Sequence, residues 1–404
     1  MKPLRLVVLG TLASDAFAGM TWMTMQIAAG LRRLGHDVYY FETTSDWPYH
    51  PARQGKIADS VYAVPYLARV AEWFGLGDRW AYRRSYSDKA WLGIEGTRAI
   101  ELMATADAVF NIAGATRVDQ ENLSVRRLVF YGTDPTFHEL AFRKGIGDTR
   151  EVLAEHHDVV TYGENIGQPD CLIPPLHHFR ATTRQPVLMD CWEFGQPTYD
   201  RFTTVGNWLQ TSRDIEYEGV RYLWSKHHEF LKFIDIPRLV DRPIELATNL
   251  TDTETDWQGQ GATIPAFALP ADARTILGDN GWRVTDAGSF STDPWAYRDY
   301  IGESSGEFTV ARDLNVRLQS GWFSERSACY LAAGRPVITQ DTGFGKVLPT
   351  GEGLFSFTTK DEILAAFDAI DSDYSRHSRA ARAIANEYFR SDVVLTKLLT
   401  DLGY

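Results

Sequence analysis

The sequence is poor in cysteine and contains no long hydrophobic run. Three cysteines occur in 404 residues, at Cys171, Cys191 and Cys329, far apart and without CxxC spacing. Such spacing excludes a disulfide framework and provides no zinc-knuckle pattern. No apolar run reaches the roughly 18 residues that a transmembrane helix needs. These absences predict a cytoplasmic protein without a transmembrane segment.

The chain also lacks an excess of basic residues and several catalytic motifs. Its net charge of −12 argues against a nucleic-acid partner bound by phosphate neutralisation. Neither G-x-G-x-x-G nor HExxH occurs, so neither a dinucleotide fingerprint nor a zinc protease is indicated. A nucleophilic Ser-His-Asp or Cys-His arrangement is not indicated either. Adjacent histidines at 156–157, 177–178 and 227–228 point in different directions on a helix or strand, so no metal site is predicted.

What the sequence does contain is a series of short apolar strands alternating with helices. A chain of 404 residues is expected to form two domains. Residues 4–10 read as a buried strand, and a loop, a helix and a second strand at 36–42 follow, which is the opening of a doubly wound α/β sheet. Residues 45–93 read as helices and loops, and 251–262 as a surface loop. Further strands are predicted at 106–114, 126–135, 156–165 and 171–175.

The most informative stretch is residues 306–357, which reads as strand, loop, helix, strand and glycine loop. The first loop ends at Ser320–Gly321 and opens a helix, so unpaired backbone N–H groups lie at the positive end of the helix dipole, where a phosphate binds well. The second loop, residues 342–345, follows a strand end, where open α/β sheets bind ligands. The alternative is an ordinary crossover whose glycines serve turns alone.

The segment GWFSERSACYLAAGRPVITQDTGF resembles the donor-binding domain of GT-B glycosyltransferases, as a divergent bacterial branch similar to families 1 and 4. The GL..LGHDV ending of the first unit resembles their acceptor domain. The resemblance implies an α/β fold of two Rossmann-like domains facing across a cleft. Residues 1–188, joined by the C-terminal helix 386–404, would bind the acceptor, and residues 189–385 the donor. Two positions that are glutamates in retaining members are Cys329 and Gly321 here, so the motif does not assign the anomeric outcome.

The resemblance also implies a set of donor-binding residues. Backbone amides of the first loop would hold the diphosphate, arginines would pair with its oxygens, and the later loop would hold sugar hydroxyls. The alternatives are a helix cap for Ser320 or Ser324 and a loop cap for Asp341. Expected in the donor site are Asn207, Arg213, Gly288, Ser289, Arg317, Ser320, Gly321, Trp322, Phe323, Ser324, Arg326, Asp341, Thr342, Gly343 and Phe344.

In the first domain, the candidate catalytic residues are two aspartates at strand ends. Asp15 lies in the first loop and would deprotonate the acceptor if the enzyme inverts; Asp134 is the second candidate base. Their alternatives are a turn residue or helix cap and the start of an Asx-Pro turn. Glu164 is expected on the acceptor side, and Gly19 and Met20 would let the backbone approach the sugar.

The sequence thus predicts a metal-independent glycosyltransferase that moves a sugar from a UDP or dTDP donor to a hydroxyl or amine. The aromatic-rich residues 47–91 favour a small aromatic or hydrophobic acceptor. No cofactor is expected beyond the nucleotide-sugar co-substrate, and a homodimer is left open. The alternatives are a nucleotide-sugar epimerase, a non-catalytic sugar-nucleotide-binding protein and a glycosyltransferase acting on modified DNA bases.

Overall fold

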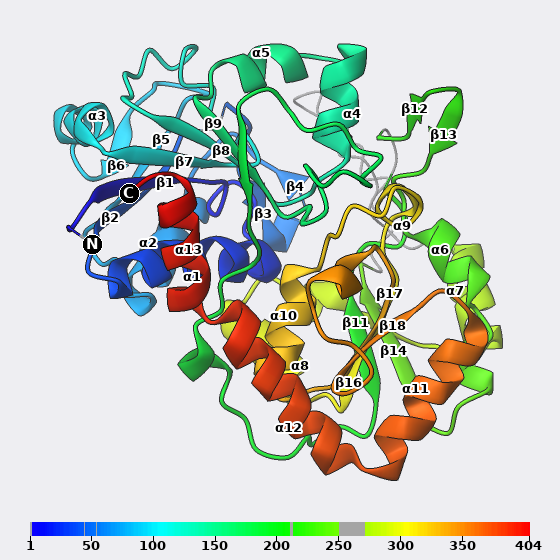
Figure 1. Ribbon diagram of the computed structural model, residues 1–404. Coiled ribbons are helices and arrows are strands. Elements are labelled where there is room, and N and C mark those ends of the chain that lie inside the picture. Colours follow the sequence, from blue (N-terminus) through cyan, green and yellow to red (C-terminus); the bar gives the residue numbers. More distant parts are fainter. Residues whose placement is uncertain (1, 44, 54, 211–212, 250–270) are drawn as a thin grey trace. The chain divides into compact units, whose positions relative to one another are not determined.

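The structure, a computed structural model, describes residues 2–43, 45–53, 55–210, 213–249 and 271–404 (Figure 1). The chain divides into two compact units. The first comprises Met1–Tyr162, Pro175–Leu188 and Ser391–Tyr404, and the second comprises Gly163–Pro174 and Met189–Arg390. Residues 163–174 were predicted to belong to the first domain, but they pack with the second unit. The predicted surface loop at 251–262 lies outside the described residues.

The first unit is built on an eight-stranded sheet in the order β10-β9-β8-β7-β1-β2-β5-β6. All neighbours pair in parallel except β5 and β6. A two-stranded hairpin, β3–β4, stands apart from this sheet. The elements are β1 (Arg5–Leu9), α1 (Ala18–Arg33), β2 (Asp37–Glu42), β3 (Tyr49–His50), β4 (Gly55–Lys56), α2 (Ala63–Trp73), β5 (Trp80–Arg83), β6 (Trp91–Gly93), α3 (Gly96–Thr105), β7 (Ala108–Ile112), β8 (Leu128–Gly132), α4 (Phe137–Lys144), α5 (Thr149–Ala154), β9 (Asp158–Thr161), β10 (Phe179–Thr182) and α13 (Ser391–Asp401).

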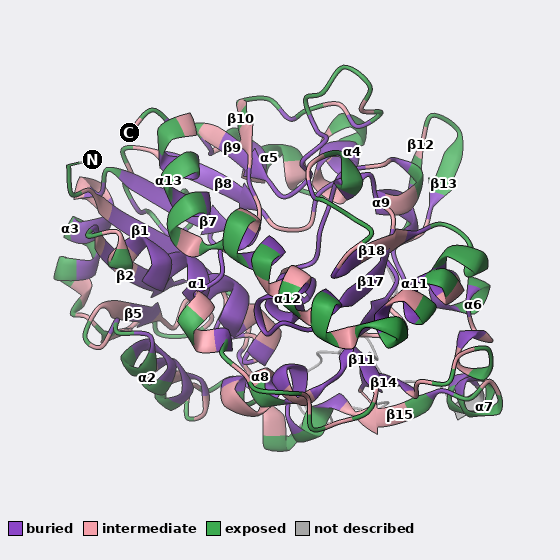
Figure 2. Ribbon diagram, turned by 60° about the horizontal axis from the view of Figure 1, so that its bottom comes forward, coloured by how far each residue is buried: buried purple, intermediate pink, exposed green. Residues whose placement is uncertain are grey.

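The central strands of this sheet form where the sequence is continuously apolar. β7 and β8 are buried along their whole length, as expected of parallel strands covered on both faces (Figure 2). Two predictions were wrong. Residues 45–93 contain strands β5 and β6 and the β3–β4 hairpin, and the last strand is β10 at Phe179–Thr182 rather than residues 171–175.

The second unit contains a six-stranded parallel sheet in the order β15-β14-β11-β16-β17-β18 and a separate hairpin, β12–β13. The elements are β11 (Phe202–Val205), β12 (Ile215–Tyr217), β13 (Val220–Tyr222), α6 (His227–Lys232), β14 (Ile244–Thr248), α7 (Ala271–Asp279), β15 (Arg283–Asp286), α8 (Pro294–Glu303), β16 (Gly306–Thr309), α9 (Asp313–Arg317), α10 (Glu325–Ala332), β17 (Val337–Gln340), β18 (Leu354–Phe357), α11 (Lys360–Ser372) and α12 (Tyr374–Ile384).

Four described helices of this unit, α8, α10, α11 and α12, begin at a residue whose side chain caps them. Asp293 accepts hydrogen bonds from two N–H groups of the first turn of α8, and Pro294 occupies its first position, which confirms the start predicted from the sequence. Thr359 and Glu362 form a capping box at α11. One core cluster joins the sheet to α6, α7 and α11, around Phe202, Phe308 and others. Among the described residues, no helix is long and apolar enough to cross a bilayer.

Candidate functional site

Two loops of the second unit meet at the carboxyl edge of its sheet. Residues 320–324 precede α10 and residues 341–344 follow β17. The Gly321 N–H donates to the Thr342 carbonyl at 2.7 Å, and the Thr342 hydroxyl donates to the Trp322 carbonyl at 2.5 Å. The rings of Phe323 and Phe344 lie 5.3 Å apart. The two loops that the sequence singled out are therefore direct neighbours.

The turn before α10 is satisfied in part by its own side chains. The Trp322 N–H donates to the Ser320 hydroxyl at 3.2 Å, and the Arg326 N–H donates to the Ser324 hydroxyl at 3.3 Å, so Ser324 is the helix cap. Within the described chain, the N–H groups of Phe323, Ser324 and Glu325 make no hydrogen bond. Three amides at the positive end of α10 thus remain available to an anion.

Lys226, a residue that the sequence analysis missed, brings a cation to the same turn. It directly precedes α6, and its ammonium lies 5.7 Å from the centroid of the Trp322 ring. Among the described residues its ammonium makes no ion pair or hydrogen bond, whereas its backbone carbonyl accepts the N–H groups of Glu229 and Phe230.

Burial lowers the pKa of Lys226 to about 7, and the nearby positive charges of Arg326 and Arg312 add to that effect. The negative charges of Glu325 and Glu307 oppose this shift without pairing with the ammonium. A desolvated cation without an ion-pair partner favours an incoming anion.

Two arginines lie close to one tryptophan in the same unit. The guanidinium of Arg312 lies 3.9 Å from the centroid of Trp224, and that of Arg213 lies 5.1 Å from it. Arg312 also donates to the side chain of Gln210 at 3.2 Å. Arg213 was expected in the donor site, whereas no sequence signal marked Arg312. Asn207, in the loop after β11, is half-buried.

Arg326 differs from its expected role. Its guanidinium is buried and pairs with Glu307 at 2.6 Å, donates to the Val205 carbonyl at 2.7 Å and to the Thr309 hydroxyl at 3.1 Å. These bonds hold α10 against β16 and β11, so in this structure the group that was expected to grip a diphosphate is directed into the protein interior. Arg317 is exposed at the end of α9, where it bonds to Asp313 at 3.3 Å.

The remaining candidates of this unit occupy two places. Asp341 accepts a hydrogen bond from the Gly343 N–H at 3.0 Å, which is the loop-capping role left open by the sequence. Gly288 and Ser289 form a short helical turn after β15, and both bond to Asp286. Because β14 and β11 separate β15 from β16, this turn lies away from the two loops along the sheet edge.

In the first unit, β2 clamps the loop that carries Asp15. The Glu42 carboxylate accepts the N–H groups of Ala13 and Ser14 at 2.8 and 2.7 Å. The Tyr40 hydroxyl accepts a hydrogen bond from the Leu12 N–H of the same loop at 2.9 Å. Burial raises the pKa of Glu42 to about 7. The only sequence signal for this clamp is the glutamate that ends β2, and it was not among the predicted site residues.

Asp15 has a raised pKa and lies close to aromatic side chains. Burial raises the pKa of Asp15, and the positive charge of Lys56 opposes the rise. The Tyr49 N–H donates to the Ser14 carbonyl at 2.8 Å, and its ring lies 4.8 Å from that of Phe17. The β3–β4 hairpin therefore places aromatic surface next to the candidate base.

The other first-domain candidates are less closely grouped. Asp134 is half-buried in the β8–α4 loop, and because β7 lies between β8 and β1, it is separated from Asp15 by roughly 10 Å of sheet width. Gly19 and Met20 belong to the first turn of α1 rather than to the loop before it. Glu164 is buried and belongs to the second unit.

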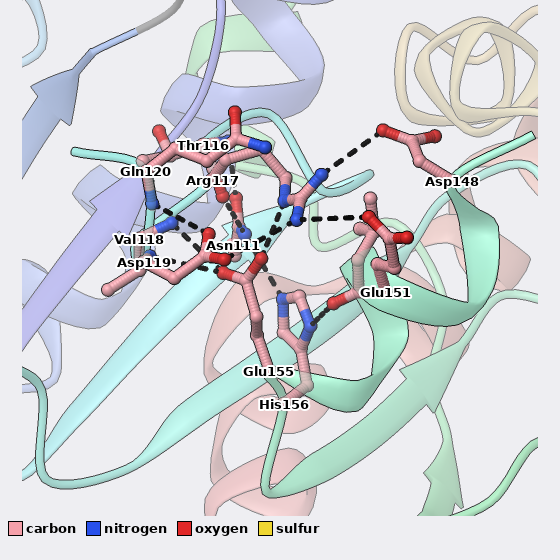
Figure 3. Close-up of polar contacts among 11 residues, drawn as sticks. Asn111, Thr116, Arg117, Val118, Asp119, Gln120, Asp148, Glu151, Glu155 and His156 are labelled. Carbon is pink, nitrogen blue, oxygen red and sulfur yellow. Dashed lines mark hydrogen bonds and ion pairs between the residues drawn. The ribbon is translucent and has the colours of Figure 1, made fainter. Parts of the chain in front are cut away.

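A further polar cluster braces the chain after β7 (Figure 3). Arg117 pairs with Glu155 at 2.5 Å and with Asp148 at 3.2 Å. Asn111 donates to the Thr116 carbonyl at 2.9 Å, and it also lies 3.1 Å from the ring of His156. Burial lowers the pKa of His156 to about 4. Because these groups satisfy one another, the cluster is structural. Within the described residues, no group of three or more His, Cys, Asp or Glu side chains is placed to hold a metal.

Comparison with known proteins identifies the fold. No family model matches the sequence, and no curated protein is similar to it in sequence. Solved structures are similar along the whole chain. Sucrose-phosphate synthase from Thermosynechococcus elongatus has a TM-score of 0.55 at 11% identity, covering 98% of this chain and 99% of that one. Anabaena HepE in complex with UDP and glucose has a TM-score of 0.54 at 10% identity, covering 99% of both. An α-glucosyltransferase in complex with UDP and a 13-mer DNA has a TM-score of 0.57 at 8% identity, covering 100% of both. The chain therefore has the GT-B fold of glycosyltransferases, built from two Rossmann-like units.

Proposed function

We propose that the protein is a glycosyltransferase that uses a nucleotide-diphosphate sugar, with UDP or dTDP as the carrier. In the reaction, the bond between the anomeric carbon and the diphosphate breaks, and a bond to an acceptor oxygen or nitrogen forms. The acceptor proton passes to a base. The proposal rests on the fold together with the charge and hydrogen-bond geometry of the second unit.

One observation carries the donor assignment: the Lys226 ammonium lies against Trp322 and forms no ion pair with a described residue, at the turn where three amides have no acceptor among the described residues. Together these groups offer a diphosphate one positive charge and three N–H donors. Their interactions with the diphosphate are stronger where water is excluded, because the local dielectric constant is lower there. Because charge accumulates on the diphosphate as it leaves, the same groups would stabilise the transition state. We therefore propose that these groups, and no metal ion, neutralise the leaving group.

On the acceptor side, we propose Asp15 as the base if the reaction inverts the anomeric centre. A carboxylate with a raised pKa is a better proton acceptor at neutral pH than an ordinary aspartate. The nearby rings of Phe17 and Tyr49 support a small acceptor with an aromatic or hydrophobic face.

A thermal-shift screen with UDP, dTDP, GDP and ADP tests the donor assignment. One nucleotide should raise the melting temperature, since a ligand at 100 times its Kd stabilises by about 2.7 kcal/mol. Lys226→Met should abolish most of that shift. Lys360→Met is the matched control, because Lys360 pairs with Asp235 at an exposed site. A protein that responds to none of the four nucleotides would contradict the proposal.

Product analysis separates transfer from its alternatives. Incubation of a nucleotide sugar without acceptor distinguishes an epimerase, which converts the donor alone, from a transferase, which needs an acceptor. A protein that binds the nucleotide but gives no product with any acceptor would be a binding protein. We expect turnover that depends on an acceptor.

The similarity to an α-glucosyltransferase in complex with DNA favours one second candidate, a modified DNA base as acceptor. The net charge of −12 opposes it, since affinity for DNA comes largely from phosphate neutralisation. Retention of duplex DNA at low salt, lost steeply as salt is raised, would support the DNA acceptor over a small molecule.

A further inference from the structure

A segment of chain between two first-unit strands packs on the two loops of the candidate donor site. The chain leaves β9, passes through Gly163–Pro174, and later enters β10, yet this segment belongs to the second unit. Its contact is centred on Asn165, which is buried. The backbone N–H of Asn165 donates to the Ser320 carbonyl at 3.1 Å.

The Asn165 side chain joins the two loops. Its Nδ2 donates to the Gln319 carbonyl at 2.9 Å and to the Gly343 carbonyl at 3.2 Å. A primary amide has two N–H donors on one nitrogen, and both are used here, one on each loop. An aspartate of the same shape would direct an oxygen at two carbonyls, and an alanine would leave both carbonyls without this donor.

The glycines of both loops are shaped around the same residue. A Cβ at Gly321 would lie 2.6 Å from the Asn165 backbone nitrogen, and a Cβ at Gly343 would lie 2.5 Å from its Nδ2. Both glycines also have positive φ, at 76° and 85°. The close approach of Asn165 therefore requires glycine on each side of it.

We propose that Asn165 is a positioning residue of the donor site. It fixes the spacing between the amides of residues 323–325 and the loop 341–344, so that the diphosphate and the sugar of one donor can be held at once. This inference rests on the proposed function. It predicts that losing Asn165 harms binding of the complete nucleotide sugar, which spans both loops, more than binding of UDP, which needs the amide turn.

Asn165→Ala and Asn165→Asp test the proposal, with UDP and UDP-glucose as probes. Because Asn165→Ala removes the hydrogen bonds that set the spacing of the two loops, we expect the KM for UDP-glucose to rise about tenfold or more. The Kd for UDP, measured by calorimetry, should change about threefold or less. Asp170→Ala is the control, since Asp170 lies on the same segment but pairs with Lys346 at the surface.

The geometry is tested separately by melting temperature. Gly343→Ala collides with Asn165, so its cost should be smaller in the Asn165→Ala background than in the wild type. If the two substitutions are additive, or if Asn165→Ala lowers only stability and leaves the KM for UDP-glucose unchanged, the positioning role is wrong. If the wild type binds neither probe, the proposed function fails and the inference fails with it.

Discussion

The strongest test of the donor site uses the acid–base behaviour of Lys226. Burial gives its ammonium a pKa of about 7 in the free protein. A bound diphosphate would restore the ordinary preference for the charged form, with a pKa near 10.4. Nucleotide binding must then take up a proton whenever the pH exceeds 7. Affinity should fall as the pH rises, because more of the free protein has to be protonated before it binds.

The magnitude follows from the titration of the free protein. With a pKa of about 7, roughly 24% of Lys226 is charged at pH 7.5 and roughly 3% at pH 8.5. The Kd for UDP should therefore rise about eightfold between these values, or about 1.2 kcal/mol. The terminal phosphate of UDP titrates near pH 6 and is fully ionised over this range, so it does not contribute.

Isothermal calorimetry in buffers with different ionisation enthalpies measures both effects. At pH 8.5 we expect about one proton taken up per UDP bound. Lys226→Met should bind weakly at every pH, and Lys226→Arg should bind with no pH dependence, since its charge is permanent. Lys360→Met should keep the wild-type profile. A wild-type Kd that is the same at pH 7.5 and 8.5, with no proton uptake, would refute this assignment of Lys226.

Three further predictions concern stability and metal dependence. Arg326→Ala should destabilise the protein by about 3–5 kcal/mol in chemical denaturation, because it leaves the Glu307 carboxylate buried and unpaired. Arg317→Ala, which breaks an exposed ion pair, should cost about 1 kcal/mol or less. The pKa of His156 is about 4 in the folded protein and 6.5 in the unfolded chain, so the free energy of unfolding should fall by up to about 3 kcal/mol as the pH drops from 6.5 to 4. His156→Gln should remove this pH dependence of stability, and His177→Gln at the surface should leave it unchanged. EDTA should leave turnover unchanged if Lys226 and the amides neutralise the leaving group, so loss of activity that Mg²⁺ restores would count against that mechanism.

The sheet of the first unit was predictable because its central strands are largely apolar on both faces. Residues 4–10 contain β1, and the start of α8 at Asp293 and Pro294 follows from capping chemistry alone. β5, by contrast, has the sequence WAYR, which shows neither an apolar run nor clear alternation. It becomes a strand because β2 offers it a parallel edge, and that edge is a property of the assembled sheet.

The candidate site was predicted in its loops but not in its charges. The turn before α10 could be predicted from the sequence, because a Ser-Gly pair stands directly ahead of a predicted helix. The position of the backbone amides at the start of that helix follows from this pattern. The choice among the arginines could not be predicted, because Arg326 finds its partner Glu307 in β16, and only the packing of α10 on that strand brings them together. Lys226 carries no motif, and its low pKa arises from burial that the chain creates only when folded.

The glycines of the two donor-site loops are positions whose structural reason could not be predicted from the sequence. Gly321 and Gly343 were expected in the donor site, yet each lies against Asn165, which is 156 and 178 residues upstream of them, respectively. A glycine is required both where a ligand approaches the backbone closely and where a buried side-chain amide does, since neither leaves room for a Cβ. The sequence alone therefore does not distinguish the two cases. The two cases differ in which backbone N–H and C=O groups are left without a hydrogen-bond partner. Asn165 uses carbonyls of both loops and none of the N–H groups at residues 323–325. A ligand for this turn should therefore be an acceptor of hydrogen bonds with negative charge, and it should approach from Phe323 to Glu325 rather than at the glycines.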